Sequence, residues 1–315
     1  MAKLADVIVP EVFNPYVLKK TTELDAFIQA GIVATSPELQ RRVDAGGAFI
    51  NMPYWNDLEG DDEVHVDTGD LTPQKFTSGK DIAVVIGRAK SWYVTDLAKE
   101  LAGSDPMADI GDKVARFWSR MRQKALINTL TGAFGAASMS TNVKDISGET
   151  GAAAVISQNT TVDAAQLLGD HKENLSGIVM HSAVEAKLAK DQAIVYIQEA
   201  GVSDRVRTYM GKRVIVDDNM PNSAGVYTTY LFGQGAIGYA PAPVEAPVEV
   251  ARDALGSGGQ DVLVVRSHYI QHPRGIKWNV TTQLPSNAQL ATGTNWLKVY
   301  NTKDIRIVQF KHKIA

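Results

Sequence analysis

The pattern in this chain that comes nearest to a cofactor site is a glycine-rich run. Gly233 to Gly238 matches G-x-G-x-x-G and follows a predicted strand. In a dinucleotide-binding fold this loop leads into a helix, whose N-terminus holds the pyrophosphate. Here Pro241 and Pro243 follow shortly afterwards, and no helix continues through them. We therefore expect no nucleotide site at this loop and no cofactor.

Two histidines have a spacing that could bind zinc. His268 and His272 are four residues apart, which on a helix places both on one face. The zinc-protease pattern also requires a glutamate after the first histidine, where this chain has Tyr269. Pro273 and the β-rich surroundings disfavour a helix. We expect two surface or strand histidines and no metal.

The carboxylates and serines offer no catalytic arrangement either. The acidic run from Asp57 to Asp67 lacks the spacing and central glycine of a calcium loop. Asp217 and Asp218 are adjacent, so on a strand they would point to opposite faces. Ser182 follows His181 without the flanking pattern of a nucleophile elbow. The sequence thus predicts no catalytic residue and favours a structural role, with an enzyme site assembled from scattered residues as the alternative.

Length, composition and net charge further restrict the class of protein. The 315 residues suggest one large or two modest domains. Cysteine is absent, which removes disulfides, thiolate zinc sites and cysteine nucleophiles. The N-terminal run, interrupted by Asp6, does not read as a signal peptide, and no apolar stretch approaches the ~20 residues that span a bilayer. A net charge of −3 argues against a dedicated DNA binder and suits a container wall that faces nucleic acid.

The first half of the chain predicts two extended features. Residues 1–20 read as an arm, because Pro10 and Pro15 disfavour helix; a frayed terminus is the alternative. Residues 48–55 (AFINMPYW) read as a strand, with a returning strand that alternates through Ile82, Val84 and Ile86. About thirty residues separate the two strands, which is longer than a compact hairpin loop. We therefore predict a long projecting hairpin with an acidic tip.

A long helix should follow the hairpin. Asp105 can cap it and Pro106 suits its first position, and apolar residues then recur at helical spacing to about Ala133. Four basic residues lie along this helix: Arg116, Arg120, Arg122 and Lys124. They indicate either a solvated face or a face turned to DNA or a neighbouring subunit.

The second half reads as a β/α segment that closes in strands. Helices are expected over 164–174 and 183–190, with strands over 177–181, 214–216 and 228–232. Residues 135–160 read as an irregular connection, and residues 241–260 contain three prolines and a glycine-rich turn, GSGG. The closing strands are expected over 262–265, 276–281 and 305–310.

Several runs resemble a family of tailed-phage major capsid proteins with the Hong Kong 97-type fold. They are NMPYWNDLEG from Asn51, WYVTDLAKELAGSDPM from Trp92, FWSRMRQKALINTLTG from Phe117 and GIVMHSAVEAKLAK from Gly177. The resemblance implies an α+β fold with an N-terminal arm and short helices (1–45) and an extended hairpin loop (46–95). A peripheral domain with the spine helix would take 96–161 and 251–315, and an axial domain 162–250.

The resemblance also implies a function and partners. Subunits would assemble into hexamers and pentamers of an icosahedral shell around double-stranded DNA, in the host cytoplasm and then in the virion. The residues expected at contacts between subunits are Val7, Val9, Phe13, Tyr54, Trp55, Asp57, Glu59, Asp61, Asp62, Glu63, Arg116 and Arg120. Because the arm begins almost at Met1, any scaffolding protein is expected to be separate; portal and decoration proteins are further partners, and no membrane is. The nearest alternative is the shell protein of an encapsulin-like nanocompartment.

Overall fold

The computed structural model describes residues 26–58, 60–63, 72–96, 110–197 and 206–314. The arm predicted over 1–20 and the predicted helix start at Asp105 and Pro106 lie outside these residues. The described chain mixes helices and strands, in agreement with the predicted α+β class. Its α-helices are α3 (Ala26–Gln29), α4 (Pro37–Asp44), α6 (Ile110–Gly135), α7 (Gln158–Ala165), α8 (Ser182–Lys190) and α9 (Asn287–Leu290).

The largest sheet carries the β/α half of the chain. Its order is β5-β17-β11-β6-β9-β8-β7, with β10 paired to β11. The strands are β5 (Val143–Asp145), β6 (Leu175–Met180), β7 (Ile194–Ile197), β8 (Val206–Tyr209), β9 (Lys212–Val216), β10 (Asn222–Ser223), β11 (Val226–Gly233) and β17 (Ile307–His312). Ile178, Leu231 and Phe310 are fully buried in one cluster, so the last strand of the chain closes this core.

A second sheet is built around the longest strand. Its strands are β1 (Val33–Ala34), β4 (Ile86–Thr95), β12 (Ile237–Ala242), β13 (Val248–Asp253) and β14 (Gln260–Pro273). One half of β14 pairs with β12, the other half pairs with β13, and β4 follows β14 along its length. Two small sheets join β2 (Phe49–Trp55) to β3 (Ser78–Val84) and β15 (Ile276–Trp278) to β16 (Trp296–Lys298).

The long helix α6 packs on the second sheet. Val114, Ala115 and Trp118 are buried against Leu263 and Val265 of β14. Its 26 residues give a length of ~39 Å at ~1.5 Å per residue. The predicted end near Ala133 is confirmed to within two residues, since the helix ends at Gly135.

Short 3-10 turns fill the connections around these elements. They are η1 (Ala137–Asn142), η2 (Gly151–Ala154), η3 (Gln166–Asn174), η4 (Gly256–Gly258) and η5 (Gly293–Asn295). The short helix predicted over 164–174 is confirmed as the 3-10 helix η3, which follows directly on α7. A capping box at Ser157 starts α7 earlier, and a left-handed Gly169 interrupts η3. The glycine-rich turn predicted within 241–260 is confirmed as η4, and the same stretch also contains strand β13, which was not predicted.

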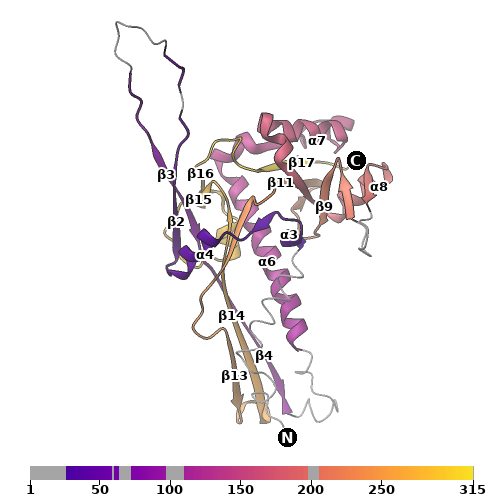
Figure 1. Ribbon diagram of the computed structural model, residues 1–315. Coiled ribbons are helices and arrows are strands. Elements are labelled where there is room, and N and C mark those ends of the chain that lie inside the picture. Colours follow the sequence, from indigo (N-terminus) through magenta and orange to yellow (C-terminus); the bar gives the residue numbers. More distant parts are fainter. Residues whose placement is uncertain (1–25, 59, 64–71, 97–109, 198–205, 315) are drawn as a thin grey trace.

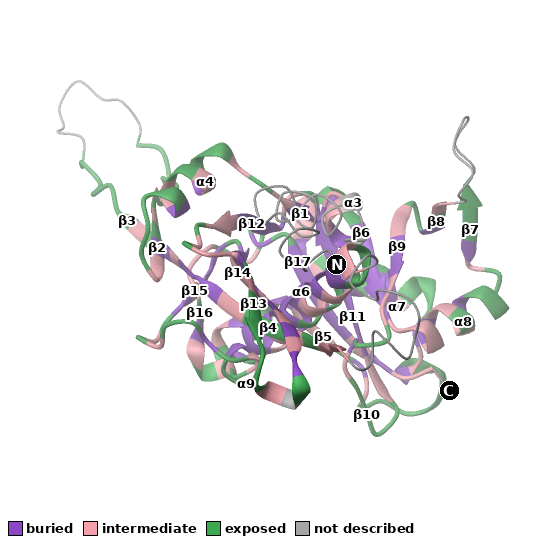
Figure 2. Cartoon of the chain, turned by 90° about the horizontal axis from the view of Figure 1, so that it is seen from below, coloured by how far each residue is buried: buried purple, intermediate pink, exposed green. Residues whose placement is uncertain are grey.

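The described residues form an elongated molecule (Figure 1). The β2–β3 hairpin projects at one end, and β4, β13 and β14 run with α6 towards the other. The sheet that carries β9, β11 and β17 lies to one side. Buried residues gather where α6 meets the sheets, whereas the outer part of the hairpin and the end of β7 are largely exposed (Figure 2). Among the described residues, no helix is both long and apolar enough to cross a membrane.

Candidate interaction surface

The predicted hairpin is present and projects from the body (Figure 1). Its strands pair antiparallel from Phe49 opposite Val84 to Trp55 opposite Ser78. On β2 the predicted alternation is confirmed, since Ile50 is buried while Asn51 is exposed. The predicted returning strand is confirmed as β3, although burial does not alternate along it, because Asp81, Ala83 and Val84 are all buried. The returning strand is therefore anchored in the body before it reaches out.

The hairpin carries exposed apolar side chains near the point where it leaves the body. Trp55 is 69% exposed and Phe76 is 50% exposed. Their rings contact each other with centroids 4.9 Å apart, and Leu58 beyond them is exposed as well. Aromatic side chains on an exposed surface are typical of binding hot spots. This cluster has the composition of a protein-binding surface.

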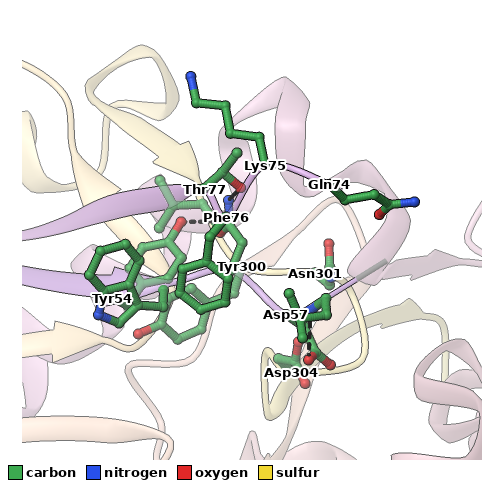
Figure 3. Close-up of a pocket in the computed structure, with 13 residues that line it drawn as sticks. Tyr54, Asp57, Gln74, Lys75, Phe76, Thr77, Tyr300, Asn301 and Asp304 are labelled. Atoms are coloured by element: carbon green, nitrogen blue, oxygen red, sulfur yellow. Dashed lines mark hydrogen bonds between the residues drawn. The ribbon is translucent and has the colours of Figure 1, made fainter. Parts of the chain in front are cut away.

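A groove of about 670 Å³ lies at the base of the hairpin (Figure 3). It is lined by the hairpin on one side and by residues 299–301 and Asp304 on the other. The Tyr54 hydroxyl donates to the Val299 carbonyl at 2.7 Å, and its ring contacts Tyr300 edge-on with centroids 4.7 Å apart. Of the predicted contact residues, Tyr54 therefore fixes the hairpin to its own subunit, whereas Trp55 remains exposed.

A buried pair of hydrogen-bonded side chains holds the returning strand in the body. Asp81 on β3 lies 2.9 Å from Nε2 of His272 on β14 and accepts a hydrogen bond from the Gly275 N–H. Burial alone would raise the pKa of Asp81, but the charge of His272 and the hydrogen bonds outweigh it and lower that pKa. The two residues are 191 positions apart, so no local pattern could reveal the contact. His272 is thus an internal anchor, which the expectation of a surface or strand histidine did not specify.

The acidic residues predicted at contacts lie along the hairpin. Asp57, Asp61, Asp62 and Glu63 are all exposed, and Glu59 lies outside the described residues. Asp57 accepts a hydrogen bond from the N–H of Leu58, and Glu63 accepts one from the N–H of Thr72. The other predicted contact residues of the arm, Val7, Val9 and Phe13, also lie outside the described residues.

The basic residues of α6 divide into two groups. Arg116, Arg120 and Lys124 are exposed. Arg122 is only 2% exposed, so its assignment to an outer face is wrong. Its Nη1 donates to the Tyr239 hydroxyl at 2.6 Å, and its guanidinium lies over the same ring. The residue points inward because it falls on the side of the helix that packs on β12.

The patterns considered for chemistry have structural roles. The run Gly233 to Gly238 joins β11 to β12 and leads into a strand, so it lacks the helix of a dinucleotide site. His181 Nδ1 accepts a hydrogen bond from the Ala183 N–H and so caps α8. Within the described part of the chain, no three histidine or acidic side chains are grouped as metal ligands.

Solved structures of phage capsids share this architecture. The capsid of cyanophage Pam1 aligns with a TM-score of 0.58 at 14% identity, over 90% of this chain and 89% of that one. The capsid of Ralstonia phage GP4 aligns with a TM-score of 0.59 at 9% identity, over 92% and 91%. The fold is therefore the Hong Kong 97-type fold of tailed-phage capsid proteins, as predicted.

Sequence comparison shows the family within this class. A model described as Gp13-like, major capsid protein 13-like, matches residues 30–257. The chain is 48% identical over 322 residues to the major capsid protein of Bacillus phage SPP1, covering 99% of this chain and 98% of the relative. The chain belongs to the Gp13-like major capsid protein family. The prediction of a phage major capsid protein is confirmed, and the nanocompartment alternative is set aside.

Proposed function

We propose that the projecting hairpin joins each subunit to a neighbour in the head shell. The observation that carries this proposal is the exposed cluster of Trp55, Leu58 and Phe76 on a ribbon that extends beyond the body of its own subunit. In a monomer these apolar side chains stay exposed to water, which gives no hydrophobic stabilisation. Contact with another copy would remove them from water, which is favourable. Shells are tiled by heterologous contacts of this kind, in which unlike surfaces of identical copies meet.

The proposal extends to the wider assembly. Subunits form hexamers and pentamers in an icosahedral shell around double-stranded DNA, first in the host cytoplasm and finally in the virion. Val7, Val9 and Phe13 of the arm add contacts with neighbours. Separate scaffolding, portal and decoration proteins act as further partners. The subunit has no catalytic role.

The proposed division of the subunit follows the resemblance. Residues 162–250 form the axial domain, and 96–161 with 251–315 form the peripheral domain. The pairing of β17 and β5 into the sheet of β6 and β11 supports close coupling between the two. A shift of one domain would therefore act directly on the other.

Deletion of the hairpin tests the proposal. Removing Asp57 to Thr77 and inserting one glycine after Asn56 closes the strands with a two-residue Asn-Gly turn and keeps the pairing of Trp55 with Ser78. We expect a folded subunit, with an unchanged thermal melt, that no longer forms particles in sedimentation and electron microscopy. The control is Gly148→Ala, since a Cβ there meets nothing within 4 Å. Normal shells from the deleted variant would contradict the role of the hairpin.

A further inference from the structure

The base of the hairpin holds two aromatic rings, each of which lies over a glycine. Tyr54 of β2 pairs directly with Gly79 of β3, and a Cβ on Gly79 would overlap the Tyr54 ring. A Cβ on Gly275, in the turn after β14, would meet the Tyr300 ring at 2.7 Å. The two rings contact each other edge-on (Figure 3). Glycine at both positions therefore allows the rings to lie directly against the backbone.

Hydrogen bonds join these rings and glycines into a closed circuit. The Tyr54 hydroxyl donates to the Val299 carbonyl. The N–H groups of Val299 and Tyr300 donate in turn to the Gly275 carbonyl, at 2.9 and 3.3 Å. The Gly275 N–H donates to Asp81 on β3, so the circuit returns to the hairpin. The hairpin latch is defined as Tyr54, Gly79, Asp81, Gly275, Val299 and Tyr300.

The hairpin latch holds both strands of the hairpin to the same turn. Tyr54 connects β2 to this turn and Asp81 connects β3 to it, so the hairpin cannot rotate here without breaking hydrogen bonds. Burial and the charge of Asp81 raise the pKa of Tyr54, so its hydroxyl keeps the proton that it donates. Beyond Trp55, the described part of the hairpin forms hydrogen bonds only within itself, such as that from the Asn56 N–H to the Thr77 carbonyl.

A small rotation at the hairpin latch produces a large displacement further out. Eight residues separate Tyr54 from Asp62, an extended span of about 26 Å at ~3.3 Å per residue. Over that span a rotation of about 10° moves the chain by about 4.5 Å. A gap of even ~1 Å removes much of the attraction between packed atoms. The angle at the latch therefore decides where a neighbouring copy can sit.

We propose that the hairpin latch sets the angle of the hairpin and, through it, the curvature of the shell. The inference rests on the proposed function, because the hairpin acts on curvature only when it joins a neighbour. Tyr54 and Gly79 are positioning residues, which act through the exposed side chains of Trp55 and Phe76. With one angle, every hairpin contact turns the next copy by the same amount, and the shell closes at one diameter. With the latch open, the angle varies from copy to copy and so does the diameter.

Spin labels test the angle independently of assembly. The chain has no cysteine, so Asp62→Cys on the hairpin and Arg41→Cys on α4 provide two specific sites, both exposed. Pulsed electron paramagnetic resonance measures their separation in doubly labelled subunits within a large excess of unlabelled protein. Adding Tyr54→Ala should widen the distance distribution by about 4–5 Å, the displacement expected for ~10° of rotation. An unchanged distribution overturns the role of the latch.

Particle diameters test the consequence for the shell. Tyr54→Ala removes the ring, and Gly79→Ala pushes the ring aside and draws its hydroxyl away from Val299. Each should give shells of mixed diameter in electron microscopy, whereas Gly148→Ala, where a Cβ is free, should give one diameter. Gly79→Ala with Tyr54→Ala should resemble the single variants, because both changes open the same latch. Uniform shells of wild-type diameter from this double variant would show that the clash alone caused the defect, and would overturn the proposal.

The two measurements together interpret every other result. Loss of all particles with a widened label distance supports the proposal, because a free hairpin no longer meets its neighbour. Loss of particles with an unchanged distance overturns it and makes Tyr54 a contact residue. A widened distance with shells of one diameter overturns the link to curvature, and the hairpin deletion then decides the proposed function separately. If thermal melts show that Tyr54→Ala does not fold, Tyr54→Phe, which loses only the hydroxyl, takes its place under the same criteria.

Discussion

Asp81 and His272 form a buried hydrogen-bonded pair that ties the projecting hairpin to the central sheet. The carboxylate and Nε2 lie 2.9 Å apart, and both side chains are 3% exposed. The same carboxylate accepts the Gly275 N–H at the turn after β14. The pair therefore determines where β3 leaves the body, and with it the direction of the hairpin.

Removal of Asp81 should destabilise the subunit. We expect Asp81→Ala to lower the free energy of unfolding by about 3–5 kcal/mol, because it leaves His272 and the Gly275 N–H buried without their partner. Because the pKa of Asp81 is lowered in the fold, its contribution is complete above the unfolded value of about 4 and is lost as the pH falls further. Urea unfolding at pH 7 and at pH 3 measures both effects. Asp62→Ala, at an exposed position, is the control and should change stability by less than ~0.5 kcal/mol.

His312 should make stability depend on pH. Burial lowers the pKa of this histidine to about 4, while its Nε2 lies 2.8 Å from the Thr229 hydroxyl. The unfolded chain takes up a proton below about pH 6.5 and the folded chain does not, so stability falls between that pH and 4. The loss is about 3 kcal/mol at ~1.4 kcal/mol per pKa unit.

Comparison with His312→Asn isolates this contribution. Urea unfolding across pH 7.5 to 4.5 should give a flatter dependence for the variant than for the wild type. Equal slopes for the two proteins would show that His312 titrates in the fold as it does in the unfolded chain.

Gly132 should tolerate no side chain, although it lies inside a helix. A Cβ at this position would clash with the Leu290 carbonyl oxygen and would approach the indole of Trp296. In an exposed helix, glycine to alanine stabilises by up to ~1 kcal/mol. Here we expect Gly132→Ala to cost about 1–3 kcal/mol or more, because α6 must move off α9. The thermal melts of this variant and of Gly148→Ala, where a Cβ is free, test the sign.

Trp55 and Phe76 should matter to assembly and not to folding. Both side chains are at least half exposed, so Trp55→Ala with Phe76→Ala should change subunit stability by less than ~1 kcal/mol. We expect a clear loss of particles in sedimentation at the same protein concentration. Val162→Ala removes exposed apolar surface from α7 and should leave assembly intact. A normal particle yield from the double variant would exclude this cluster from the contact.

Elements with strong local patterns were predictable from the sequence. The strand from Phe49, its return to Val84 and the long helix to Gly135 follow from alternation and apolar spacing. The hairpin was predictable as a long ribbon because its loop has little apolar content to bury.

Features that depend on distant contacts were not predictable in the same way. Arg122 reads as one more surface charge in a basic helix, and only the pairing of β12 with β14 places Tyr239 beneath it. Nearby prolines and glycines mask strand β13 in the sequence. It forms because it pairs with β14, a contact that the local sequence does not reveal. The anchor at Asp81 depends on His272, far away in sequence.

The continuity of β3 and β4 has a mechanical consequence. Only Val85 separates the two strands, so the returning arm of the hairpin runs on into the central sheet. From there β4 is hydrogen-bonded to β14 over ten successive residues, ending with Thr95 opposite Gln260. A force that pulls on the hairpin is therefore transmitted as tension along one continuous backbone to the opposite end of the molecule.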